Sequence, residues 1–99
     1  MARVELAPEV FDDFDRFMEH LEQFAVEDAP QRIAEIVDGL AILSHSPFIG
    51  RPARGGKREL VVGQGVRGYV AHYRYIADID TVFILAIRSQ REAGHRSDP

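Results

Sequence analysis

The residues with the clearest chemical potential lie near the end of the chain. Arg88, Arg91 and Arg96 fall within nine residues, and His95 stands beside the last of them. Arginine holds phosphate or carboxylate groups through planar, two-pronged contacts, so this stretch could bind a polyanion such as RNA or an acidic protein surface. The alternative is a solvated tail, which the interleaved Glu92 makes equally acceptable.

Arg58 and Glu59 form a second candidate group, at the start of a predicted strand. Glu59 could act as a general base beside an arginine that holds a phosphate. More often, adjacent charges of this kind lie at a sheet edge and discourage aggregation. Arg51, Arg54 and Lys57 add positive charge just before Arg58 and favour an anionic partner.

The aromatic and histidine side chains do not by themselves indicate a site. Tyr69, Tyr73 and Tyr75 alternate along a predicted strand, where they could stack on bases. We expect them instead to line the core, and His72 to be an ordinary sheet residue. The chain has no cysteine, and its four histidines do not have the spacing of metal ligands. The glycine pairs precede strands, unlike those of nucleotide-binding loops, so we expect no metal and no cofactor.

The length of 99 residues suits one small domain, because independent cores usually run to about 100–150 residues. We expect a single domain over residues 1–99, in which residues 90–99 form a polar tail or a short terminal helix. The first residues carry no secretion signal. The apolar run Val82–Ile87 is far shorter than the roughly 20 residues that cross a bilayer. A soluble, cytoplasmic protein without membrane contact is expected.

The net charge of −4 hides a division between the two halves of the chain. Residues 1–50 contain three arginines and eleven acidic residues, a balance of −8, whereas residues 51–99 contain nine basic and five acidic residues, a balance of +4. In a single domain, this split predicts an acidic side and a basic side.

Two amphipathic helices are predicted in the acidic half. The first covers about residues 8–25, with Pro8 in its first turn and an apolar stripe at spacings of three and four: Val10, Phe14, Phe17, Leu21 and Phe24. The second follows Asp28 as its cap and has a similar stripe: Ile33, Ile36, Val37, Leu40 and Leu43. The short link between the helices favours an antiparallel hairpin.

The basic half changes to the two-residue period of strands. Strands are predicted at Arg3–Leu6, Arg58–Val62, Tyr69–Ile76 and Thr81–Ser89, with a loop over residues 48–56. The expected fold is therefore α+β, in the order β-α-α-β-β-β. An antiparallel sheet would pack one face against the helical hairpin. The other face would be partly exposed and would carry some of four arginines: Arg58, Arg67, Arg74 and Arg88.

With this order in view, residues 2–91 resemble the RelE/ParE superfamily of bacterial type II toxin–antitoxin toxins. The resemblance rests on the order and spacing of several pieces. They are the opening strand before Pro8-Glu9, the acidic helices, the loop Ser46–Pro52, the strand Arg58–Val62, and the segments Gly68–Arg74 and Asp80–Arg88. Ala7 departs from the Ser or Thr common before that proline, which affects a helix cap and not a site.

The resemblance implies a small toxin that a co-expressed antitoxin neutralises by wrapping around its helices and sheet edge. Apolar grooves on such a surface accept amphipathic helices and added strands. The antitoxin is expected to contact apolar residues of both helices: Phe14, Phe17, Leu21, Ile36 and Leu40. A toxin–antitoxin hetero-oligomer would result.

Two activities divide the superfamily, and a third interpretation is a module that has lost toxicity. ParE-like members poison DNA gyrase, and RelE-like members cut mRNA in the ribosome. The Gly-Arg-Pro loop, the Arg-Glu-Leu-Val strand and the lack of tyrosine in the tail favour the ParE-like activity, with gyrase contacted by Arg88, Arg91 and Arg96. In the ribonuclease alternative, Glu59 would be the base and His95 the acid, in a set made of Arg58, Glu59, Arg74, Arg88, Arg91 and His95.

Overall fold

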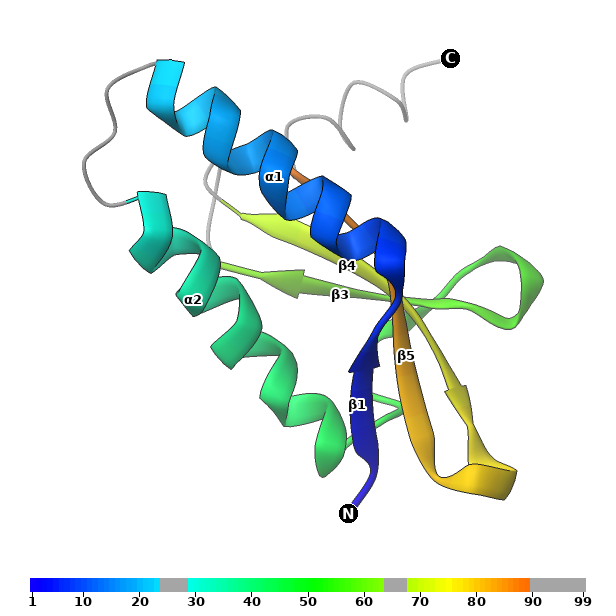
Figure 1. Cartoon of the computed structure of the whole chain (residues 1–99). Helices are drawn as coiled ribbons and strands as arrows, with labels where there is room; N and C mark the ends of the chain where they lie inside the picture. Colours follow the sequence, from blue (N-terminus) through cyan, green and yellow to red (C-terminus); the bar gives the residue numbers. More distant parts are fainter. Residues whose placement is uncertain (24–28, 64–67, 90–99) are drawn as a thin grey trace.

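The computed structural model describes residues 1–23, 29–63 and 68–89, in one layer of strands and one of helices (Figure 1). The helices are α1 (Pro8–Gln23) and α2 (Ala29–Leu40). The strands are β1 (Arg3–Leu6), β2 (Arg51–Pro52), β3 (Arg58–Val62), β4 (Tyr69–Ile76) and β5 (Thr81–Ser89). The predicted α+β fold is confirmed, with β2 as one additional strand.

The strands form one five-stranded sheet in the order β1-β5-β4-β3-β2. Antiparallel pairing joins β3 to β4 and β4 to β5, as predicted, and also joins β2 to β3. β1 instead lies parallel to β5, with Arg3 opposite Thr81 and Leu6 opposite Ile84. The sheet is therefore mixed, with one parallel pair at the β1 edge. A parallel pair requires a long crossover connection, and the segment between β1 and β5 provides it.

β2 lies within the segment that was predicted as a loop. Its two residues, Arg51 and Pro52, lie opposite Glu59 and Arg58 of β3. Because two residues are too few to show an alternating pattern, the sequence could not reveal this strand.

Both helices are present where the apolar stripes predict them. α1 is described as far as Gln23, and Asp28, the predicted cap of α2, lies outside the described residues. α2 ends at Leu40, and the chain tightens into a 3₁₀ helix at Ala41–Ser44 before Pro47. Within the described ranges, no helix is both long and apolar enough to cross a bilayer.

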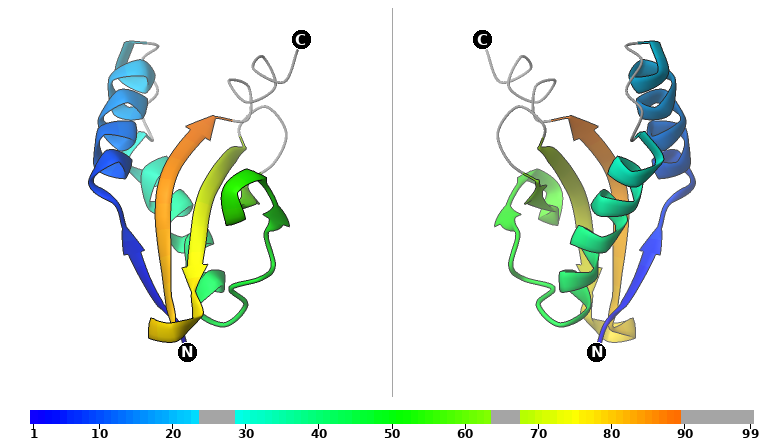
Figure 2. Two further views of the ribbon diagram at one scale, coloured as in Figure 1. Left: turned by 90° about the vertical axis from the view of Figure 1, so that its right-hand side faces the viewer. Right: turned by 90° about the vertical axis from the view of Figure 1, so that its left-hand side faces the viewer.

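The two helices cover the same face of the sheet, here called the helix-covered face; the opposite one is called the outer face (Figure 2). The core between the layers combines both apolar stripes with β4 and β5: Val10, Phe17, Ile36, Leu40, Leu43, Ala71, Tyr73, Val82, Ile84 and Ile87. Tyr69 and Tyr75 pack against this core. The prediction that the alternating tyrosines line the core is therefore confirmed.

A β-bulge in β5 decides which of its side chains face the helices. The pairing with β4 shifts at Leu85, which has no direct partner. An extra residue in one strand reverses the alternation of side chains beyond it. Ile84 and Ile87 are three residues apart, yet both lie in the core for this reason. Arg88, the next residue, is directed to the outer face.

The hydroxyl of Tyr73 holds the chain segment that leads from the helices to β2. It accepts a hydrogen bond from the Gly50 amide at 2.9 Å and donates one to the Pro47 carbonyl oxygen at 2.8 Å. Arg58 donates to two more carbonyl oxygens of this segment, those of Phe48 at 3.2 Å and Gly50 at 2.8 Å. A Cβ at Gly50 would lie 2.6 Å from the tyrosine oxygen, so glycine is required there.

We expect Tyr73→Phe to lower the free energy of unfolding by about 1–3 kcal/mol, because the Gly50 amide and the Pro47 carbonyl would lose their buried partner. Urea unfolding followed by circular dichroism measures the change. Tyr75→Phe is the matched control, since the Tyr75 hydroxyl bonds to the exposed Asp80 carboxylate. The control should stay within about 0.5 kcal/mol of wild type. Equal losses in the two variants would contradict the role given to Tyr73.

Candidate functional site

Strand pairing places three of the predicted site residues on the outer face of the sheet. Glu59 on β3 lies opposite His72 on β4, and Arg88 on β5 lies opposite Val70. Arg74 shares this face with His72, since side chains two residues apart in a strand point the same way. Their strand positions therefore direct Glu59, Arg74 and Arg88 toward the side of the sheet that the helices leave uncovered, but the Arg88 guanidinium contacts Asp13 of α1.

Arg58 does not join them. It lies opposite the core residue Tyr73, so its side chain leaves the sheet on the helix-covered face. There its guanidinium bonds the Phe48 and Gly50 carbonyl oxygens. Adjacent residues of a strand point to opposite faces, so Arg58 and Glu59 lie on different sides of the sheet, and their suggested joint action on one phosphate stays a prediction.

Glu59 is surrounded by a cation and an imidazole. One carboxylate oxygen accepts a hydrogen bond from Arg51 at 2.9 Å, and the other lies 3.9 Å from Nδ1 of His72. A carboxylate beside an imidazole can take part in proton transfer, so His72 belongs with the candidate residues, although it was predicted to be an ordinary sheet residue. Within the described ranges, no group of three histidine, aspartate or glutamate side chains is placed to hold a metal ion.

Arg74 supports the connection between β2 and β3. Its guanidinium donates a hydrogen bond to the Gly55 carbonyl oxygen at 2.6 Å. Gly55 and Gly56 both have positive φ angles, 72° and 75°, which glycine adopts without a steric penalty. Arg74 thus has a structural contact in addition to any role in binding an anion.

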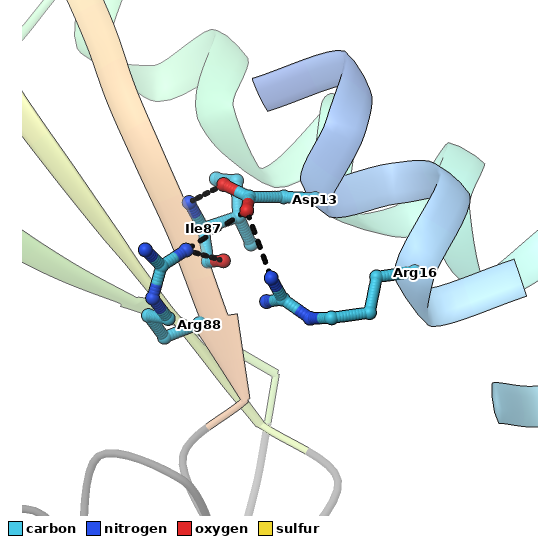
Figure 3. A network of polar contacts seen from close by, with 4 residues as sticks. All are labelled: Asp13, Arg16, Ile87 and Arg88. Atoms are coloured by element: carbon cyan, nitrogen blue, oxygen red, sulfur yellow. Dashed lines mark hydrogen bonds and ion pairs between the residues drawn. The ribbon is translucent and has the colours of Figure 1, made fainter. Parts of the chain in front are cut away.

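Arg88 is paired with a buried carboxylate of α1, that of Asp13 (Figure 3). One oxygen of Asp13 accepts from Arg88 at 2.9 Å and from Arg16 at 3.2 Å, and the other accepts from the Ile87 amide at 2.9 Å. β1 pairs with β5 only as far as Ile84, so this amide lies beyond the parallel strand. Asp13 therefore provides the hydrogen-bond acceptor for the Ile87 amide at the unpaired edge of β5. It also offsets part of the charge of the Arg88 guanidinium.

Asp13 was not among the predicted site residues, although the sequence contains a signal for it. It lies three residues after Val10 and four before Phe17, so it falls on the apolar stripe and not on the hydrated face of the helix. It is only 5% exposed. A carboxylate inside an apolar stripe needs a partner within the core, and the sequence does not show which one.

The remaining cations of the predicted sites lie outside the described residues. Arg91, His95 and Arg96 fall in residues 90–99, and Arg67 falls in residues 64–67. The roles predicted for Arg91, His95 and Arg96 remain predictions.

The helix residues predicted to contact an antitoxin are mostly turned toward the sheet. Phe17, Ile36 and Leu40 are core residues, and Phe14 is half-buried. The side chain of Leu21 lies outside the described part of the chain. The apolar stripes pack against the sheet. A partner that docks on the folded protein therefore cannot reach the buried side chains of Phe17, Ile36 and Leu40. Among the described side chains of α1 and α2, the large apolar ones left exposed are Phe11 and Val37.

We expect Asp13→Ala to lower the free energy of unfolding by about 2–3 kcal/mol, because the buried Ile87 amide and the Arg88 guanidinium lose their acceptor. Asp15→Ala, at an exposed position of the same helix, should change it by no more than about 0.5 kcal/mol. Urea unfolding of both variants measures the difference. If the two variants were equally stable, the contact of Asp13 with β5 would not matter for the fold.

Comparison with known proteins identifies relatives that have the same architecture. The family model of the ParE toxin of the type II toxin–antitoxin system parDE matches residues 4–94. A search of curated proteins finds no match.

Two solved structures share the fold. A chain of the chromosomal ParDE toxin–antitoxin system from P. aeruginosa is 22% identical with a TM-score of 0.74, over 90% of this chain and 96% of that chain. A chain of the toxin–antitoxin complex RelBE2 from Mycobacterium tuberculosis is also 22% identical, with a TM-score of 0.56, over 89% of this chain and 96% of that one. Since the family model covers nearly all of the chain, the protein belongs to the ParE toxin family of type II toxin–antitoxin systems.

Proposed function

We propose that this toxin inhibits growth by acting on DNA gyrase. The observation that carries the choice between the two activities of the superfamily is the separation of Arg58 from Glu59 and Arg74 by the thickness of the sheet, while Asp13 of α1 holds the Arg88 guanidinium. A ribonuclease must surround one scissile phosphate with its cations and its base. The described part of the chain divides that set between two faces. The match to the ParE family model supports the same choice.

The proposed contact with gyrase uses the basic C-terminal stretch. Arg88 shares the carboxylate of Asp13 with Arg16, so its charge is partly offset and its position is fixed by the core. Arg91 and Arg96 follow it in sequence and provide the positive charge for the target. Gyrase is an intracellular enzyme, so the toxin would act in the cytoplasm.

The cognate antitoxin is proposed to dock on the helices. Both similar structures come from toxin–antitoxin systems, which supports such a partner. Phe11 and Val37 are exposed on α1 and α2, and exposed acidic residues lie near them in sequence on the same helices: Asp12, Asp15, Glu35 and Asp38. An antitoxin segment that combines apolar and basic residues would complement this surface.

A second candidate function is cleavage of mRNA on the ribosome, which the contact between Glu59 and His72 favours. The two groups are 3.9 Å apart on the outer face, with Arg51 beside Glu59, so in this alternative they would serve as base and acid. In this alternative, His72 takes the place that was expected for His95. Arg58 would have no part in it.

Purified full-length toxin should inhibit supercoiling by gyrase, and the product of the neighbouring reading frame should restore it at equimolar concentration. Arg91→Ala/Arg96→Ala should weaken inhibition at least about tenfold, because two charges that meet the target are lost. Arg54→Ala, an exposed cation of the β2–β3 connection, is the control. A toxin that arrests growth yet leaves supercoiling untouched would overturn gyrase as the target. A chain that does not slow growth would be a non-toxic interaction module.

Glu59→Gln and His72→Gln distinguish the second candidate. If this pair cleaves mRNA, each variant should lose about 100-fold or more of the cleavage rate in a ribosome-coupled assay. If gyrase is the target, both variants should still inhibit supercoiling, and wild type should leave ribosome-bound mRNA intact. Circular dichroism verifies that the variants are folded.

A further inference from the structure

Lys57 and Arg74 are two exposed cations that meet at the β2–β3 connection. Arg58 lies opposite Tyr73, and Lys57, one residue earlier, keeps an extended backbone. Lys57 therefore stands beside Arg74, and both are directed to the outer face, because successive residues of an extended chain alternate between faces. The Arg74 guanidinium lies against the same connection, since it bonds the Gly55 carbonyl oxygen at 2.6 Å.

No described carboxylate offsets the charge of either side chain. Lys57 makes no hydrogen bond or ion pair within the described ranges, and Arg74 bonds only a carbonyl oxygen. The described acids on the outer face of the strands already have basic partners: Glu5 has Arg3 and Glu59 has Arg51. In the turn after β4, Asp80 bonds Tyr75, and neither Asp78 nor Asp80 forms an ion pair with the two cations. Like charges side by side in a sheet are destabilising, and an anionic ligand would supply the missing counter-charge.

The connection that carries Lys57 is ordered and open to solvent. The Ala53 amide donates to the Lys57 carbonyl oxygen at 2.8 Å. A Cβ at Gly56 would meet no atom within 4 Å, so open space surrounds the turn. The connection extends from the sheet on the side away from α1 and α2, where a long partner can approach without meeting the helices (Figure 1). Arg54, in the turn itself, adds a positive charge nearby, but strand pairing does not fix the direction of its side chain.

The composition of this surface favours nucleic acid over protein. None of the large apolar side chains exposed in the described ranges lies in residues 51–60, whereas a protein interface has an apolar centre. Protein–DNA contacts are instead polar and positively charged. Single-stranded RNA is held largely by bases stacked on exposed rings. The described tyrosines pack in or against the core, and Phe83, opposite Arg74, is half-buried, which favours a duplex.

We propose that Lys57 and Arg74 bind the phosphate backbone of duplex DNA, without regard to its sequence. This binding goes beyond the proposed inhibition of gyrase, for which the contact lies beyond Ser89. Each cation that neutralises a phosphate releases a counterion, so every such contact adds about 0.9 to the slope of log affinity against log salt concentration. Two contacts therefore contribute a slope of about 1.8 in magnitude.

Fluorescence anisotropy of a labelled DNA duplex of arbitrary sequence, titrated with full-length toxin at several salt concentrations, tests this proposal. Lys57→Gln/Arg74→Gln should weaken binding at least about tenfold at low salt and reduce the slope by about 1.8, because two phosphate contacts are lost. Lys57→Gln alone should reduce it by about 0.9, and this variant stays folded because the side chain has no described contact. Arg3→Gln is the matched control, since it removes an exposed cation of the same face that Glu5 already neutralises. It should change the slope by less than about 0.5.

The measurement contains no gyrase, so its outcome is independent of the proposed target. A wild-type toxin that does not bind the duplex at low salt overturns the proposal. So does a Lys57→Gln/Arg74→Gln variant that keeps the wild-type slope. Tighter binding of a labelled single-stranded RNA, lost in the same variant, would overturn the choice of duplex DNA. Loss of antitoxin binding in this variant, with DNA binding unchanged, would assign the two cations to that protein instead.

Discussion

The buried carboxylate of Asp13 is the interaction on which the assembly of the two layers depends. The N-terminal strand is short, so the last residues of β5 have no strand beside them on that edge. An unpaired amide near the core is costly, and Asp13 supplies its acceptor from α1. The same carboxylate binds Arg88 and Arg16. One side chain thus fixes α1 against β5 and sets the position of Arg88, which begins the basic C-terminal stretch.

The alternation of side chains across the sheet then divides the chemistry of the protein. The face toward α1 and α2 receives the tyrosines, the aliphatic residues of β5 and the stem of Arg58. The outer face receives Glu59, His72 and Arg74, and the guanidinium of Arg88 is bound by Asp13 of α1. The single bulge at Leu85 maintains this division to the end of β5, because it returns Ile87 to the core and directs Arg88 outward. Arg58 and Glu59, which are adjacent in the sequence, therefore lie on opposite faces of the sheet.

In the described ranges, most of the arginines that suggest anion binding also have structural contacts. Arg58 supports the loop before β2, Arg74 supports the loop after it, and Arg88 pairs with Asp13. Guanidinium groups with five donors can serve both purposes, since a bond to a carbonyl oxygen leaves the charge in place. Pairing with a carboxylate, in contrast, offsets the charge of the guanidinium. This difference separates Arg58 and Arg74 from Arg88, and it shifts the expected target contact toward the residues that follow β5.

The periodic patterns of the chain were sufficient to predict the two helices, the three long antiparallel strands, their order and the packing of one layer on the other. These features depend on residues three, four or two positions apart, and such spacing is visible in one dimension. The parallel pairing of β1, the two-residue strand β2, the bulge at Leu85 and the partners of Asp13, Glu59 and Tyr73 were decided by tertiary structure. The pairing of β1 and the contacts of Asp13 and Tyr73 join residues far apart in the chain, whereas β2 is too short to show a pattern. A carboxylate or hydroxyl within an apolar pattern shows that the group needs a hydrogen-bonding partner. Only the folded chain determines which partner lies close enough.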